Sequence, residues 1–257
     1  MMLNRTKHTV FSLFLLVVSC ICLLIGCQSD ELDQINANNE ENTNDIPNKI
    51  MPLGASRVQG LTPLFESYRF ELWKDLIDGG WDFDYIGTET ETGSYPNYEN
   101  LSFDPDHQGK MSWTSEKIFE ELESILHETG YPDIVLFSSP GGNDILDGLP
   151  YENVIENIND IIDLFQDRNP NIVILIEQLA PGKTSFMTPE LTLIFDQAVL
   201  DVETIAQEQT DENSLVIPVN MFEGFVDSYL ADDIHYNTEG AEFIAQRYYE
   251  VLENVLE

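Results

Sequence analysis

Ser56, Asp232 and His235 have the residue types and the spacing for nucleophilic catalysis. Ser56 ends a Gly-Ala-Ser turn directly after an apolar run, which is where an exposed nucleophile lies between a strand and a helix. Asp232 precedes His235 by three residues. At this spacing the carboxylate can accept a hydrogen bond from Nδ1–H and leave Nε2 free as a base. The chemistry that this set predicts is attack of Ser56 on an acyl carbon, with His235 moving the proton.

Acyl transfer also requires hydrogen-bond donors for the oxyanion. A turn at 140–144 follows another apolar run and carries Asn143, whose side-chain amide could enter the same crevice. The backbone N–H of Ser56 and the amide of Asn143 are therefore expected donors. The mechanism requires no metal and no other cofactor.

Short apolar runs alternate with amphipathic stretches along the body of the chain. The expected strands are 50–53, 83–86, 134–137, 172–176 and 215–219. The expected helices are 64–77, 115–127, 154–165, 189–206 and 239–256, the last with Thr238 as N-cap. This alternation predicts a three-layer α/β/α sandwich around a five-stranded parallel sheet, in which ligands bind at the carboxyl ends of the strands. The candidate residues all follow such ends.

The three segments, in this order, resemble the SGNH (GDSL-type) hydrolase superfamily. Its strand–Gly-Asp-Ser block is matched by 51–56, its Gly-x-Asn-Asp block by 141–144, and its Asp-x-x-His block by 232–235. The resemblance covers about 49–257 and implies a flavodoxin-like fold and a serine esterase. It also implies that Gly109, as the glycine of the second block, supplies a further oxyanion donor.

Several stretches look most like the acetylxylan-esterase branch of the carbohydrate esterases; they are 67–69, 83–87, 106–114 and 177–181. This branch implies a substrate from which acetyl groups are removed, such as acetylated xylan. His107, Trp113 and Tyr236 are candidate substrate-binding residues, although the two aromatic rings would equally well pack beside the site. Two alternatives stay open: a thioesterase or lysophospholipase acting on longer chains, and a non-catalytic carbohydrate-binding lipoprotein.

The chain departs from the family pattern at four positions. Ala55 replaces the aspartate before the nucleophile, and Arg57 replaces a small apolar residue after it. Ser112 replaces a second glycine of the oxyanion loop, and Asp233 replaces a glycine between the acid and the base. The departures at Ala55, Arg57 and Ser112 motivate the non-catalytic alternative.

A second Asp–His pair has the same spacing, since Asp104 precedes His107 by three residues. It could form a rival dyad, or join Asp106 in a metal site, or simply shape a substrate loop. His127 is expected on a helix surface.

The composition excludes some partners. The chain has 257 residues, of which 42% are hydrophobic, with 47 acidic residues against 11 basic ones. Such a chain can bury a sizeable core, but its surface repels phosphate backbones, so we expect no nucleic-acid partner. We expect a monomer acting on an acylated carbohydrate or another small ester.

The N-terminus has the pattern of a bacterial lipoprotein signal. A charged start is followed by an apolar stretch that ends in Leu-Ile-Gly-Cys, so we expect a signal peptide at 1–26 and lipidation of Cys27. An uncleaved signal anchor is the alternative. The acidic stretch 27–48 is expected to be a flexible linker that tethers the hydrolase domain, 49–257, to the bacterial cell envelope, at the outer membrane or cell surface.

Overall fold

The computed structural model describes residues 48–90 and 93–256. The predicted signal peptide (1–26), the lipidation site Cys27 and all but the last residue of the predicted linker (27–48) lie outside the described residues. Among the helices that are described, none combines the length and the apolar character needed to cross a membrane.

A mostly parallel sheet forms the middle layer. Its strands are β1 (Lys49–Gly54), β2 (Asp84–Tyr85), β3 (Glu89–Thr90), β4 (Asp106–Gly109), β5 (Ile134–Phe137), β6 (Val173–Gln178) and β7 (Leu215–Asn220). The order is β3-β4-β1-β5-β6-β7, with β2 also on β1, and only β3 and β4 pair antiparallel. All five expected strands are present, but the expected count of five is wrong. The two additional strands, β3 and β4, are short and polar, so they carry no apolar run.

Two short strands share one edge of β1. The strand β2 pairs with the first two residues of β1, Lys49 and Ile50, whereas β4 pairs with the last two residues of β1, Leu53 and Gly54. In the second pair Gly54 lies opposite Gly109, and a Cβ on Gly109 would lie 2.6 Å from Val58 Cβ. A side chain does not fit there, so the glycine lets β4 lie against the nucleophile turn.

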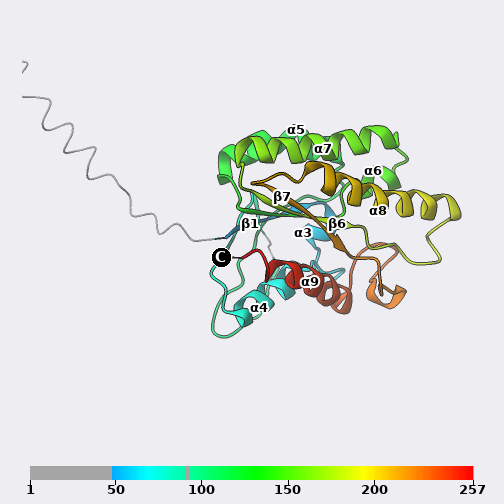
Figure 1. Cartoon of the computed structure of the whole chain (residues 1–257). Helices are drawn as coiled ribbons and strands as arrows, with labels where there is room; N and C mark the ends of the chain where they lie inside the picture. The colour runs from blue at the N-terminus through cyan, green and yellow to red at the C-terminus, as the bar shows by residue number, and fades with distance from the viewer. Residues whose placement is uncertain (1–47, 91–92, 257) are drawn as a thin grey trace, which may run out of the picture. The chain divides into compact units, whose positions relative to one another are not determined.

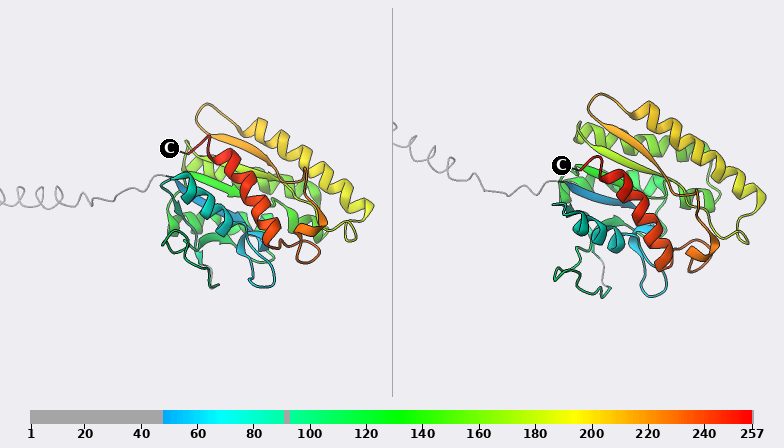
Figure 2. Two further views of the ribbon diagram at one scale, coloured as in Figure 1. Left: turned by 90° about the horizontal axis from the view of Figure 1, so that it is seen from below. Right: turned by 60° about the horizontal axis from the view of Figure 1, so that its bottom comes forward.

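Helices cover both faces of the sheet (Figure 1). They are α3 (Ser56–Gln59), α4 (Arg69–Gly79), α5 (Ser115–Thr129), α6 (Gly142–Leu146), α7 (Tyr151–Arg168), α8 (Pro189–Gln209) and α9 (Thr238–Leu252). One core lies between the sheet and α5, α7 and α8, and a second lies between the sheet and α4 and α9. The turned views show α9 running beside α4 (Figure 2). The predicted three-layer α/β/α architecture is confirmed.

The strand β5 shows why the sequence pattern is continuous. Val135 and Phe137 face the first core, while Ile134 and Leu136 face the second. Successive side chains of a strand point to opposite faces, so a strand buried on both faces is apolar at every position.

Several helix boundaries differ from the prediction by a few residues, and two of the differences, at the start of α4 and at the cap of α9, have a local cause. The helix α4 starts at Arg69 rather than at residue 64, because Leu61 and Phe65 form an antiparallel bridge in a turn before it. The N-cap of α9 is Asn237 rather than Thr238, since the Asn237 side chain accepts a hydrogen bond from the Gly240 N–H at 3.0 Å.

Candidate active site

Ser56, His235 and Asp232 lie within hydrogen-bond reach of one another. The distance from His235 Nε2 to Ser56 Oγ is 2.9 Å, and that from His235 Nδ1 to Asp232 Oδ2 is 2.7 Å. The second Asp232 oxygen accepts the backbone N–H groups of Ile234 (2.9 Å) and His235 (2.8 Å). Partial burial raises the pKa of Asp232, but these donors and the His235 ring outweigh it and lower the pKa overall. The carboxylate therefore stays ionised, as an orienting acid must.

Local structure presents the nucleophile. Gly54 has a φ of 156°, and a Cβ at this position would lie 2.8 Å from the Ser138 carbonyl oxygen, so the turn after β1 needs glycine. Ser56 then begins the short helix α3. Helix-start N–H groups have no intrahelical acceptor, and in the described part of the chain the Ser56 N–H has no hydrogen-bond partner. It is thus available to an oxyanion.

The base lies on a closed loop before α9. Leu230 and Tyr236 form an antiparallel bridge, and the Ala231 N–H donates to the His235 carbonyl at 2.8 Å. The ring of Phe65, from the turn before α4, stacks on the His235 imidazole with centroids 3.9 Å apart and planes 15° apart. Two elements far apart in the sequence therefore fix the imidazole plane.

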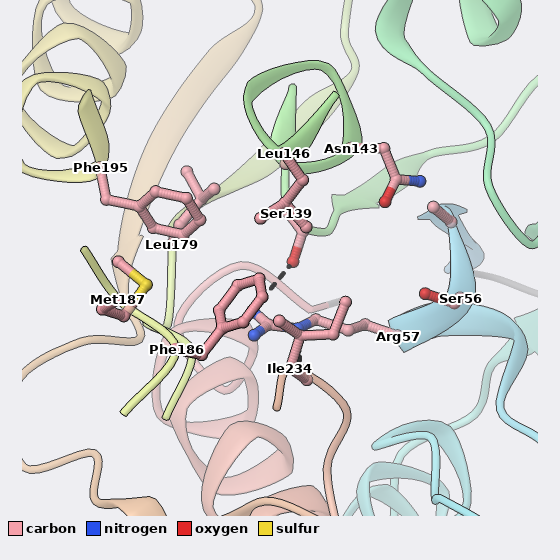
Figure 3. Close-up of a pocket in the computed structure, with 13 residues that line it drawn as sticks. Ser56, Arg57, Ser139, Asn143, Leu146, Leu179, Phe186, Met187, Phe195 and Ile234 are labelled. Atoms are coloured by element: carbon pink, nitrogen blue, oxygen red, sulfur yellow. Dashed lines mark hydrogen bonds between the residues drawn. The ribbon is translucent and has the colours of Figure 1, made fainter. Parts of the chain in front are cut away.

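Asn143 lies where the sequence predicted an oxyanion donor. It belongs to α6, which begins after Gly141, a residue with φ of 68° whose missing side chain leaves room for Val154. One hydrogen of its amide is donated to the Trp113 carbonyl at 2.8 Å. The other hydrogen remains for a ligand, and Asn143 lines the same cavity as Ser56 (Figure 3).

The prediction that Gly109 supplies an oxyanion donor is not met. Its N–H donates to His107 Nδ1 at 2.9 Å, and the residue is buried behind α3. The N–H of Ser112, by contrast, makes no hydrogen bond among residues 48–90 and 93–256, and this residue has a φ of 61°. Its neighbour Trp113 holds the Asn143 amide. The sequence held a signal for this role, because Ser112 stands where the family has the second glycine of its oxyanion loop.

Two of the three candidate substrate-binding residues are buried. His107 is 1% exposed and Tyr236 is 0% exposed, so the prediction that they contact substrate is wrong. Burial, and to a smaller extent Arg69, lower the pKa of His107 to about 2, so its ring is neutral. Trp113 is partly exposed beside Lys110, whose Nζ lies 5.0 Å from the ring centroid. A contact of Trp113 with substrate stays a prediction.

The rival pair, Asp104 and His107, forms no dyad. Both Asp104 oxygens accept backbone N–H groups, from Tyr85 at 2.8 Å and from Asp106 at 3.3 Å. Burial raises the pKa of Asp104 to about 6. Within the described ranges no cluster of histidine, cysteine and carboxylate side chains suits a metal ion. His127 is exposed on α5, as predicted.

Arg57, which departs from the family pattern, connects the nucleophile helix to two other loops. Its Nε donates to the Ile234 carbonyl at 2.9 Å, next to the base, and its Nη1 donates to the Ala180 carbonyl at 2.9 Å. The guanidinium also lies over the Tyr236 ring, 4.7 Å from its centroid. Nothing in the sequence showed that this arginine, which is 9% exposed, holds the base loop against α3.

A buried carboxylate completes this network. Ser139 Oγ accepts from Arg57 Nη1 at 3.4 Å (Figure 3) and lies 3.2 Å from Glu177 Oε2. The same oxygen of Glu177 accepts the Ser139 N–H at 2.7 Å, while Oε1 accepts the Tyr248 hydroxyl at 2.9 Å. Burial raises the pKa of Glu177, opposed by these hydrogen bonds and by the charge of Arg57.

Comparisons with known proteins agree with this fold. The chain matches no protein-family model and no curated protein sequence. It is similar in structure to an acetyl esterase variant solved with an acetate ion, at 22% identity and a TM-score of 0.68, over 80% of this chain and 97% of the other. A carbohydrate esterase of family 3 from Talaromyces cellulolyticus matches at 23% identity and a TM-score of 0.69, over 80% and 97%.

A third solved structure, a member of the lipolytic G-D-S-L family from Veillonella parvula, matches at 16% identity and a TM-score of 0.53, over 80% of this chain and 98% of the other. At these identities the likeness concerns the fold. The predicted resemblance to SGNH hydrolases, on the side of the carbohydrate esterases, is thus confirmed for the fold.

Proposed function

We propose that the protein is a serine hydrolase of carboxylic esters. The observation that carries this proposal is the continuous hydrogen-bonded series from Ser56 Oγ through His235 to Asp232. Its atoms lie at the distances that a nucleophile, a base and an orienting acid require.

In the first half of the reaction, Ser56 Oγ bonds to the acyl carbon and its proton passes to His235 Nε2. The carbonyl oxygen becomes an oxyanion, for which the Ser56 N–H, the free Asn143 amide hydrogen and the Ser112 N–H are the proposed donors. When the intermediate collapses, the bond to the alcohol breaks and the alcohol takes the proton from His235. An acyl-serine remains.

In the second half of the reaction, water takes the place of the alcohol. The water oxygen bonds to the acyl carbon while His235 takes one of the water protons. The ester bond to Ser56 then breaks, and the proton passes from His235 to Ser56 Oγ. The acid is released. Asp232 stabilises the imidazolium that forms in each half, and all atoms come from the ester, the water and these side chains.

The substrate that we propose is an acetylated carbohydrate. The support is similarity to an acetyl esterase and to a carbohydrate esterase of family 3, together with a cavity of only about 30 Å³ beside Ser56. Thioesterase or lysophospholipase activity on long chains would need more room. Arg57 no longer supports the non-catalytic alternative, because its hydrogen bonds hold the loop that carries His235.

The decisive experiment is labelling by a fluorophosphonate probe together with acetate release from acetylated xylan and from an aryl acetate. We expect labelling and acetate release by the purified protein, and loss of both in Ser56→Ala. A protein that resists the probe and releases no acetate would support the carbohydrate-binding alternative.

We further propose that Cys27 carries a lipid and tethers the hydrolase to the bacterial envelope. The support is the Leu-Ile-Gly-Cys sequence that ends the apolar stretch. Cys27→Ser should abolish incorporation of labelled palmitate; unchanged incorporation would refute the proposal.

A further inference from the structure

Two cavities lie next to each other at the carboxyl ends of β5 and β6. The smaller one, here called the acyl cavity, has a volume of about 30 Å³ and is lined by four polar side chains, Ser56, Arg57, Ser139 and Asn143, and otherwise mainly by apolar ones. The larger one, here called the apolar groove, has a volume of about 800 Å³ and runs along α8. Besides Gly182, the residues that line both are Leu179, Met187 and Phe195.

The acyl cavity suits the acyl end of an ester rather than a sugar. Leu146, Phe186 and the three shared side chains make most of its surface apolar, whereas sugar hydroxyls need hydrogen-bond partners. The hydrogen bonds of Arg57 run to Ile234, Ala180 and Ser139, within the protein. At about 30 Å³, the volume of the acyl cavity is a small fraction of the about 800 Å³ of the apolar groove, so the acyl cavity suits a short acyl group.

The residues that line both cavities separate the acyl cavity from the apolar groove, and all of them except Gly182 contribute side chains. Figure 3 shows Leu179, Met187 and Phe195 at the end of the acyl cavity that lies away from Ser56. Beyond them the groove is lined mostly by apolar side chains, namely Val199, Leu200, Phe222, Phe225 and Val226. Two threonines and two aspartates also line it: Thr184, Thr192, Asp196 and Asp227. A longer acyl chain would have to pass through the side chains of Leu179, Met187 and Phe195, which we call the wall.

The wall is held in place from several sides. Leu179 and Phe195 are 2% and 8% exposed and belong to a small hydrophobic cluster that Met187 also contacts. The loop that carries Met187 is fixed to the base loop by the Lys183 N–H, which donates to the Asp233 carbonyl at 2.8 Å. The three side chains of the wall are therefore packed against one another, and the loop that carries Met187 is held by a backbone hydrogen bond.

From this arrangement we propose that the wall of Leu179, Met187 and Phe195 sets the acyl chain length of the enzyme. It limits the acyl group to acetyl by closing off a groove that has the size and the apolar character to take a longer chain. This inference rests on the proposed esterase activity and assigns its specificity to side chains that take no part in the chemistry.

The test is kcat/KM for 4-nitrophenyl esters from acetyl to octanoyl. For the wild type we expect a fall of about 10²-fold or more between acetyl and hexanoyl. Met187→Ala and Phe195→Ala should open the groove. Each methylene that enters it adds about fourfold to kcat/KM, so the hexanoyl ester should gain on the order of 10²-fold.

Leu193→Ala is the matched control, because Leu193 also lies on α8, is 69% exposed and lines neither cavity. It should leave the chain-length profile unchanged. Met187 is less buried than Phe195 and lies in a loop, so Met187→Ala keeps the test valid if Phe195→Ala does not fold.

The proposed function and this inference fail differently. If the wild type hydrolyses no ester and resists the fluorophosphonate, the esterase proposal falls, and the inference with it. If the wild type hydrolyses acetyl and octanoyl esters equally well, or if Met187→Ala keeps the wild-type profile, the esterase stands and the role of the wall is refuted.

Discussion

Replacing Arg57 by methionine tests whether the network behind the nucleophile positions the base. The change keeps most of the side-chain length and removes the guanidinium that donates to the Ile234 and Ala180 carbonyls, both at 2.9 Å. A hydrogen bond that involves a charged group contributes about 1.5–3 kcal/mol. Part of this is offset because methionine buries well, so we expect the free energy of unfolding to fall by about 3 kcal/mol.

The effect on catalysis should exceed the effect of instability alone. Ile234 directly precedes His235, so loss of its bond to Arg57 frees the backbone that aims the imidazole at Ser56. A displacement of the base by about 1 Å costs on the order of 10²-fold in rate. We therefore expect kcat for an aryl acetate to fall about 10²-fold with KM little changed.

The assay compares variants at a temperature where chemical denaturation shows each to be fully folded. Arg57→Lys is the matched control, because lysine keeps the positive charge near Glu177 but lacks the guanidinium that reaches two carbonyls. The kcat of Arg57→Lys should therefore lie between that of the wild type and that of Arg57→Met. If folded Arg57→Met has a kcat within about threefold of the wild type, the residue stabilises the fold only and the positioning argument is wrong.

Three further changes address the remaining residues. Ser56→Ala and His235→Ala should each lower kcat by about 10³-fold or more, with the double variant scarcely worse, since both act in one proton transfer; additive losses in initial rates would contradict this. Phe65→Ala should lower kcat by about 2- to 13-fold, the value of one aromatic stack, whereas Phe65→Tyr should retain most activity; equal kcat values for both would rule out a role of the ring. The pKa of His107 is about 2 in the folded protein and near 6.5 when unfolded, so only the unfolded chain binds its proton and stability is lost as pH falls below 6.5. Between pH 7 and pH 5, the free energy of unfolding measured in urea should therefore fall by about 2 kcal/mol less for His107→Asn than for the wild type. If the free energy of unfolding depends on pH in the same way in both proteins, the burial argument is disproved.

The parts of the fold that the sequence predicted are those with an apolar pattern. The strands β5, β6 and β7 each contain a run of apolar residues, Ile134–Phe137, 173–176 and 215–219, and these runs predicted them as buried strands. The strand β4 could not be predicted, because Asp-His-Gln-Gly has no period and becomes a strand only by pairing with β1 and β3.

The triad residues were predictable because their types and local spacing carry the chemistry. The role of Gly109 was not predictable, because the orientation of a neighbouring ring decides which backbone N–H stays free. Here the Gly109 N–H donates to the His107 ring. Burial of Tyr236 beneath Arg57 depends on a contact between segments far apart in the chain, which no local pattern reveals.

The bond between Ser56 and His235 joins residues 179 positions apart, and that between Arg57 and Ile234 joins residues 177 apart. Ser56 begins the short helix directly after the first strand, whereas His235 lies in the segment that leads into the last helix. During synthesis the Ser56–His235 pair thus forms only after almost all of the domain has emerged and α9 has docked on α4. The proposed hydrolytic activity is therefore a readout of complete folding, and a fragment that lacks the C-terminal helix and the loop before it would carry Ser56 without the histidine proposed to activate it.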